Sequence, residues 1–209
     1  SYIIIYSAIL VVVVAFLLAF VYSALKPQQD INVALDKKKQ ILAALNIRDL
    51  SDADAAAKYT EVVECDEIID TNATVINKGE KGGENAGFKL NSADLKEGKL
   101  AVYVCNVDGE KKYVIPVYGM GLWGSIWGYI ALDADKNTIY GAYFDHQGET
   151  AGLGAEIKDS KAWQDLFKGK KIFSADGAAV AIAVKKASDV KNPASEVDAV
   201  TGATLTSDG

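Results

Sequence analysis

The most hydrophobic part of the chain comes first. Residues 3–25 contain no charged side chain, and at about 1.5 Å per residue a helix of this length reaches roughly 34 Å. That span crosses a hydrocarbon core of about 30 Å, whereas the apolar region of a cleaved signal peptide has only about 7–15 residues. An open strand in lipid would leave its amides unpaired. The pattern therefore predicts a transmembrane anchor over residues 1–26, stopped by Lys26 and Pro27.

A helical spacing of hydrophobic residues continues beyond the anchor. It involves Ile31, Leu35, Ile41, Leu42 and Leu45, with Lys37, Lys38 and Lys39 on the opposing side. This spacing predicts a helical stalk over residues 27–47. Residues 48–99 are polar and are interrupted by the glycine-rich stretch 78–87, which favours a loop.

From residue 99 onward, hydrophobic and polar positions alternate with a period of two. Four short runs rich in Val, Ile and Tyr cover residues 99–107, 111–118, 125–133 and 137–145, and turn residues separate them, as in consecutive antiparallel strands. Ser160 and Gly169 bracket a short helix, and the apolar run 178–186 predicts another strand. We expect an α+β protein, in which one N-terminal transmembrane helix precedes an extramembrane domain over 48–209 with an antiparallel sheet and flanking helices.

Composition excludes several classes of function. The chain has 22 Lys and Arg against 28 Asp and Glu, a formal net charge of −6, so we expect no nucleic-acid partner. The two cysteines, Cys65 and Cys105, and the lone His146 are too few for an iron–sulfur cluster or a zinc finger within this chain. We expect no metal site, and we expect both cysteines to be unpaired core residues.

The stretch Gly119-Met-Gly-Leu-Trp-Gly124 matches the letters of the dinucleotide-binding motif G-x-G-x-x-G. That motif must open a helix, but a strand is predicted to follow here, so we reject a dinucleotide site. A glycine turn remains, which places Leu122 and Trp123 beside either a flat ligand or the core of the sheet. The spacing alone favours the core.

Two other polar segments could carry function. Residues 145–154 form a glycine-rich loop around His146, which either approaches a ligand closely or leaves His146 in solvent. Since the chain has no G-x-S-x-G motif, we expect neither a hydrolase triad nor any catalytic side chain. The segment 198–207 carries hydroxyls at Thr201, Thr204, Thr206 and Ser207, as expected where a loop becomes a helix N-terminus, and capping alone would explain them.

Asp198-x-x-Thr201-Gly202-Ala203-Thr204 resembles the signal on which a flavin transferase attaches FMN, through a phosphoester, to the last threonine. Gly119-x-Gly121-Leu122-Trp123 and His146-x-x-Glu149-Thr150-x-Gly152-Leu153-Gly154 resemble two further stretches of the membrane-anchored FMN-binding domains. One departure is Ala151, where that family usually has Pro. With the anchor and the stalk, the chain resembles the C-subunit family of the sodium-translocating NADH:quinone oxidoreductases, with the G-subunit family of the Rnf electron-transport complex as a close alternative.

The resemblance implies an oxidoreductase component that carries covalent FMN on Thr204. It relays electrons from an iron–sulfur centre to the next flavin in a sodium-pumping complex. Further implied cofactor-binding residues are Asp198, Thr201, Gly202, Ala203, Leu205, Thr206, Gly119, Gly121, Leu122, Trp123, His146, Glu149, Thr150, Leu153 and Lys185.

The same resemblance implies partners and a location. The partners are the other membrane and flavin subunits, the lipid bilayer and, during maturation, a flavin transferase. The location is the bacterial inner membrane, with a single pass and the main domain on the periplasmic side. A ferredoxin-dependent Rnf complex, or a flavin-free anchored binding module, are the alternatives. We also expect the polypeptide to continue beyond Gly209.

Overall fold

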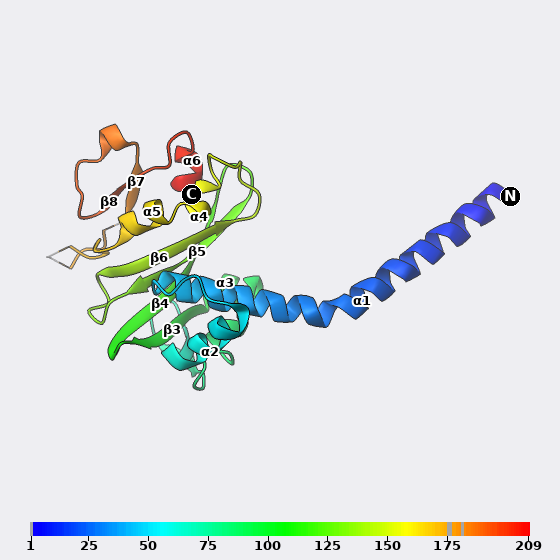
Figure 1. Ribbon diagram of the computed structural model, residues 1–209, viewed down its shortest axis with the longest axis horizontal. Helices are drawn as coiled ribbons and strands as arrows, with labels where there is room; N and C mark the ends of the chain where they lie inside the picture. Colours follow the sequence, from blue (N-terminus) through cyan, green and yellow to red (C-terminus); the bar gives the residue numbers. More distant parts are fainter. Residues whose placement is uncertain (1, 175–176, 181) are drawn as a thin grey trace. The chain divides into compact units, whose positions relative to one another are not determined.

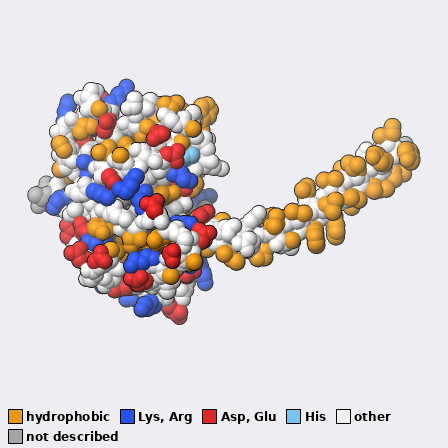
Figure 2. Space-filling model, in the orientation of Figure 1, with side chains coloured by type: hydrophobic (Ala, Val, Ile, Leu, Met, Phe, Trp, Pro, Cys, Tyr) orange, Lys and Arg blue, Asp and Glu red, His pale blue; other side chains and the backbone are white. Residues whose placement is uncertain are grey.

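The computed structural model describes residues 2–174, 177–180 and 182–209. The chain divides into two compact units, Ser1–Lys37 and Lys38–Gly209. The first unit consists of the greater part of helix α1 (Tyr2–Ala44). Among the described residues, α1 is the one helix long and apolar enough to cross a membrane. Hydrophobic side chains cover its N-terminal part (Figure 2).

The predicted anchor and stalk form a single continuous helix, which runs through Lys26 and Pro27. Pro27 lies inside α1. A proline removes one backbone hydrogen bond from a helix interior, but the turns on both sides keep their own bonds here. The last turns of α1 belong to the second unit, where Ile41, Leu42 and Leu45 are buried as core residues.

A six-stranded antiparallel sheet forms the centre of the second unit, in the order β2-β1-β3-β4-β5-β6 (Figure 1). The strands are β1 (Val63–Ile69), β2 (Val75–Lys78), β3 (Leu100–Val107), β4 (Glu110–Met120), β5 (Ser125–Leu132) and β6 (Ile139–His146). The four strands predicted between residues 99 and 145 are confirmed as β3 to β6. Their neighbours pair antiparallel through short turns.

The polar region over residues 48–99 is more structured than its composition indicates, although the glycine-rich stretch predicted as a loop is confirmed as one over residues 79–86. The region contains α2 (Asp52–Val62), β1, β2, the short helix η1 (Gly87–Lys89) and α3 (Ser92–Lys96). Ser51 caps α2 by accepting from the amide of Asp54. The fully buried Asp66 accepts from the amides of Ala86 and Phe88. The glycine-rich stretch is therefore fixed against β1 by side-chain hydrogen bonds that composition does not reveal.

The two faces of the sheet carry different helices, as the alternation of side chains along a strand requires. In β5, Ile126 and Ile130 pack against the cluster that contains Trp163 and Phe167, whereas the Trp127 indole donates to Gln40 at the end of α1. The first face is covered by α4 (Glu156–Asp159), α5 (Lys161–Gln164) and η2 (Asp165–Phe167). The second carries α2 and the last turns of α1 (Figure 1).

The C-terminal part only partly follows the sequence pattern. The predicted helix at 160–169 is confirmed as α5 and η2, with Ser160 capping by accepting from the Trp163 amide. Of the predicted strand 178–186, which includes Ala181 outside the described residues, only β7 (Ala183–Lys185) is a strand. It pairs in parallel with β8 (Glu196–Asp198) and not with the large sheet. Helices η3 (Ala187–Asp189) and α6 (Thr204–Ser207) complete the unit.

Both cysteines are buried and unpaired, as predicted. Burial raises the pKa of the Cys105 thiol well above its ordinary value. Such thiols behave as small hydrophobic residues and not as reactive groups.

Candidate functional site

A cavity of about 950 Å³ opens where the β4–β5 turn, the loop after β6 and the segment from β8 into α6 meet. Most of the site residues predicted from the sequence line it: Leu122, Trp123, Glu149, Thr150, Leu153, Asp198, Thr201, Gly202, Ala203, Thr204, Leu205 and Thr206. Gly119, Gly121, His146 and Lys185 do not line it. Residues 186–188 complete the lining, so four separate segments of the chain form one site.

The wall made by the β4–β5 turn is hydrophobic and open. An N–H of Gly121 donates to the carbonyl of Gly124 at 2.8 Å and closes the turn, so the two side chains between them project away from the sheet. Leu122 is 56% exposed and Trp123 is 70% exposed. The expectation that they belong to the core is therefore wrong, because a hairpin turn ends the alternation that strand spacing assumes. Together with the exposed Leu205, they offer apolar surface to a flat ligand.

The carboxylate of Glu149 joins the walls of the cavity. It accepts from the backbone N–H of Trp123 at 2.8 Å and from the hydroxyl of Thr206 at 2.8 Å. Burial acts to raise the pKa of Glu149, but the hydrogen bonds from Trp123 and Thr206 outweigh it and hold this pKa below its ordinary value. An ionised carboxylate therefore holds the β4–β5 turn against α6.

Two glycines make room for this carboxylate. A Cβ atom on Gly121 would lie 2.5 Å from Oε1 of Glu149, and one on Gly154 would lie 2.5 Å from Oε2. A third glycine, Gly119, has a different role, because its Cβ would lie 2.2 Å from the carbonyl oxygen of Gly209. It allows the C-terminal segment to approach β4.

Gly154→Ala should therefore displace the Glu149 carboxylate and lower the free energy of unfolding by about 1–3 kcal/mol, the usual cost of overpacking. Urea unfolding of the full chain in detergent measures this. Gly148→Ala is the matched control in the same loop, since a Cβ there meets no atom within 4 Å. Equal unfolding midpoints for the two variants would contradict the packing argument.

The threonines near the end of the chain are not equivalent. Thr206 is 2% exposed, and its hydroxyl is engaged, donating to Glu149 and accepting from the amide of Leu122 at 3.4 Å. Thr204 is half-buried and lines the cavity, and its hydroxyl has no hydrogen-bond partner among the described residues. Gly202 takes a φ of +78°, which favours glycine, and turns the chain into α6. Of the two threonines of α6, Thr204 therefore presents the accessible hydroxyl.

His146 does not line the cavity, but its ring holds the loop after β6 through a hydrogen bond. Its Nδ1 accepts from the backbone N–H of Glu149 at 3.0 Å, while its buried Nε2 has no hydrogen-bond partner among the described residues. His146 is therefore half-buried and structural here, and the interpretation that left it in solvent is wrong.

Lys185, the last residue of β7, and Lys186, which follows it, have different neighbours. Lys185 forms a salt bridge with Glu196, and this contact, together with the backbone N–H groups of Asn192 and Lys191, lowers the pKa of Glu196 to about 2. The exposed Lys186 instead lines the cavity, and sequence reasoning missed it. The pair of lysines can be seen in the sequence. Because successive side chains of a strand point to opposite sides, only the structure shows which of the two faces the cavity.

Comparison with known proteins agrees with this geometry. The sequence family described as the FMN-binding domain matches residues 121–209, which include every segment lining the cavity. The C subunit of the Na+-translocating NADH-quinone reductase of Haemophilus ducreyi is 34% identical over 207 residues, covering 88% of this chain and 76% of the relative. That of Pseudomonas aeruginosa is 30% identical, with 89% and 78% covered.

The chain belongs to the C-subunit family of the Na+-translocating NADH-quinone reductases. The crystal structure of the C subunit from Parabacteroides distasonis is 39% identical, covers 88% of each chain and superposes with a TM-score of 0.79. NqrC from Shewanella oneidensis is 25% identical, with a TM-score of 0.64. The α+β fold with its antiparallel sheet is thus the fold of the C-subunit family.

The residues of this C-subunit family member fit FMN. Exposed apolar side chains on the β4–β5 turn and α6 suit a flat aromatic ring system, while Lys186 and the first amides of α6, which have no partner inside a helix, suit its polar groups. The residues present therefore agree with the FMN-binding domain that the sequence family indicates.

Proposed function

We propose that this chain is an electron-carrying subunit of a membrane-bound, sodium-translocating NADH:quinone oxidoreductase, with FMN fastened to Thr204 through a phosphoester. The observation that carries the proposal is the contrast between the two threonines of α6. Thr206 is engaged with Glu149, whereas Thr204 offers a hydroxyl without a partner among the described residues to the cavity. Attachment needs an accessible hydroxyl beside a space that receives the ring.

The attachment is a phosphoryl transfer to threonine. The oxygen of Thr204 forms a new bond to the phosphorus of an activated flavin phosphate, and the bond from phosphorus to the leaving group of the donor breaks. The hydroxyl proton is lost, and a flavin transferase assists the step. A covalent bond keeps the cofactor at the membrane regardless of its binding equilibrium.

Several side chains then define the surroundings of the cofactor. Leu122, Trp123 and Leu153 would flank the ring, and Glu149 fixes the wall that carries the first two. FMN supplies one-electron and two-electron redox chemistry when bound, so this chain needs no general acid, base or nucleophile of its own. The role of the protein is to hold, orient and partly cover the ring.

Within the complex, the protein accepts electrons from an iron–sulfur centre of the membrane subunits and passes them to the next flavin. The anchor α1 keeps the domain at the bacterial inner membrane, on the periplasmic side. The small residues Ala8, Ala15 and Ala19 lie near one face of α1 and allow close packing against partner helices.

Intact mass measurement of the chain from a host that contains a flavin transferase tests the attachment. The expected mass exceeds that of the polypeptide by one FMN less one water, and peptide mapping places the addition on Thr204. An unmodified Thr204 in such material would overturn the proposal. Copurification with an NADH-oxidising flavin subunit tests the complex, and recovery with a ferredoxin-dependent assembly would contradict it.

Lys186→Ala should lower the midpoint potential of the flavin by up to about 20 mV, because an exposed charge contributes about 0.2–1 kcal/mol and its loss disfavours a negatively charged reduced ring. Lys185→Ala is the matched control, since Glu196 engages that amine. Redox titration of the two variants measures which lysine has the larger effect on the midpoint potential of the flavin. A larger shift in Lys185→Ala would favour the residue that the resemblance indicates.

A further inference from the structure

Asp145, at the end of β6, is 4% exposed and has donors around both carboxylate oxygens. Its Oδ1 accepts from the backbone N–H of His146 at 2.8 Å and lies 2.9 Å from the amine of Lys158. Its Oδ2 accepts from the phenol of Tyr143 at 3.2 Å and from the side-chain amide of Gln40 at 3.3 Å. These contacts fix the orientation of the carboxylate, because turning it would leave donors unsatisfied.

One of these partners belongs to α1. Gln40 lies in its last turns, and both ends of its side-chain amide are engaged with the sheet. The nitrogen donates to Asp145 on β6, and the oxygen accepts from the indole of Trp127 on β5 at 3.2 Å. The C-terminal end of α1 is therefore bonded to two adjacent strands through one side chain.

The other partners lead to the cavity. Asp145 holds the backbone N–H of His146, and the ring of His146 accepts from the backbone N–H of Glu149. Glu149 in turn binds the amide of Trp123 and the hydroxyl of Thr206. Hydrogen bonds, linked through the side chains of Asp145, His146 and Glu149, therefore connect the end of α1 with two walls of the cavity.

We propose that Asp145 is a positioning residue of the FMN site: it holds the loop after β6 so that Glu149 can join the cavity walls, and Gln40 ties this geometry to the end of α1. The identity of the ligand rests on the proposed function, but the positioning role does not. A displacement at the end of α1 then changes the surroundings of the flavin through this network.

Amide hydrogen exchange of the full-length chain without FMN, in detergent and measured by NMR, tests the positioning role. Asp145→Asn places a donor NH₂ where an oxygen now accepts. We expect protection of the Trp123 and Glu149 amides to fall about tenfold relative to amides in β3, the effect of one buried hydrogen bond being lost. Gln40→Leu, a milder change on the surface of the sheet, should produce a smaller loss at the same two amides.

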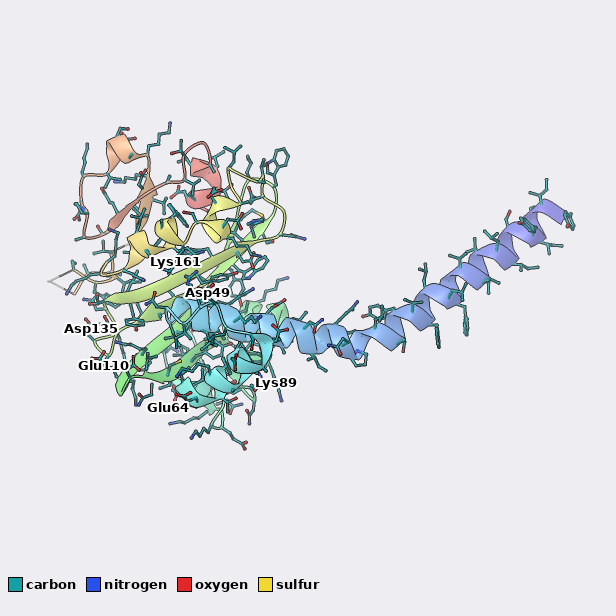
Figure 3. The ribbon with its side chains drawn as sticks, viewed as in Figure 1. Asp49, Glu64, Lys89, Glu110, Asp135 and Lys161 are labelled. Atoms are coloured by element: carbon teal, nitrogen blue, oxygen red, sulfur yellow. The ribbon has the colours of Figure 1, made fainter. Side chains whose placement is uncertain are left out.

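Asp133→Asn is the matched control. Asp133 also pairs with a lysine, the buried Lys112, at 2.7 Å, but it lies in the β5–β6 turn, at the end of β5 opposite the β4–β5 turn. Figure 3 labels Asp135 in the same turn. This control should lower protection throughout the sheet without a selective loss at Trp123 and Glu149. Unchanged relative protection in Asp145→Asn, or the same pattern in both variants, would overturn the proposal.

A second readout uses the chain with flavin attached. Asp145→Asn and Gln40→Leu should both change the visible circular dichroism of the flavin, while Asp133→Asn leaves it unchanged. If the flavin spectra of all three variants equal that of the wild type, the network from Asp145 and Gln40 does not affect the flavin, and the coupling is refuted. If the chain carries no flavin, the proposed function fails, but the exchange experiment still decides the role of Asp145.

Discussion

Thr204→Ala will abolish the fluorescent flavin band of the denatured chain in a gel, while the chain still folds. The substitution removes the hydroxyl that forms the phosphoester, so covalent attachment stops completely and not by degrees. Thr204 is half-buried and has no side-chain hydrogen bond among the described residues, so the free energy of unfolding should change by less than about 0.5 kcal/mol. Denaturing gel fluorescence and urea unfolding measure the two effects.

Three further variants make this result specific. Thr204→Ser keeps a hydroxyl and should retain some flavin. Thr201→Ala removes an exposed hydroxyl on the same cavity wall and should retain flavin fully. Thr206→Val removes the partner of Glu149 and should destabilise the domain while flavin is still attached. A fluorescent band in Thr204→Ala that peptide mapping places on Thr201 or Thr206 would show that another threonine is the attachment residue.

Glu149→Ala will lower the free energy of unfolding by about 2–4 kcal/mol, because it leaves the amide of Trp123 and the hydroxyl of Thr206 without an acceptor. Urea unfolding of the full chain in detergent measures the loss. Glu156→Ala, in the neighbouring α4, serves as the control and should cost less than about 0.5 kcal/mol. Similar losses in the two variants would show that Glu149 does not join the cavity walls.

The same carboxylate should give the domain an acid-sensitive component. The pKa of Glu149 is lower in the folded chain than its ordinary value, so its stabilising effect is complete above the ordinary glutamate pKa of about 4.3. That stabilisation is lost as the pH falls through the lower pKa of the folded state. Glu149→Gln should therefore flatten the decline of stability on acidification, and a slope equal to that of the wild type would contradict this.

Much of the fold could be predicted where one local pattern was sufficient. The alternation with a period of two located β3 to β6, and Ser160 with Gly169 located the helix after them. The prediction failed for β1, where the buried Asp66 interrupts the apolar pattern, yet its carboxylate is satisfied by amides from a distant loop. Long-range hydrogen bonds of this kind override local preference.

The candidate site was also predictable only in part from the sequence. Thr204, Leu122 and Trp123 could be named from motifs, but their surroundings could not, because a linear pattern does not show that the β4–β5 turn ends the alternation. Lys186 was missed for a related reason. The resemblance indicates its neighbour Lys185, but in the structure Lys185 pairs with Glu196 and Lys186 lines the cavity.

The sequence by itself determined the apolar anchor segment, the antiparallel strands and the segments that resemble an FMN-binding domain, since each depends on residue types at short spacing. Only the tertiary structure decided that Thr204 and not Thr206 presents an accessible hydroxyl, and that Glu149 joins the walls of the cavity. The physical reason is that burial and hydrogen bonding belong to pairs of groups far apart along the chain, and folding alone brings such groups within bonding distance.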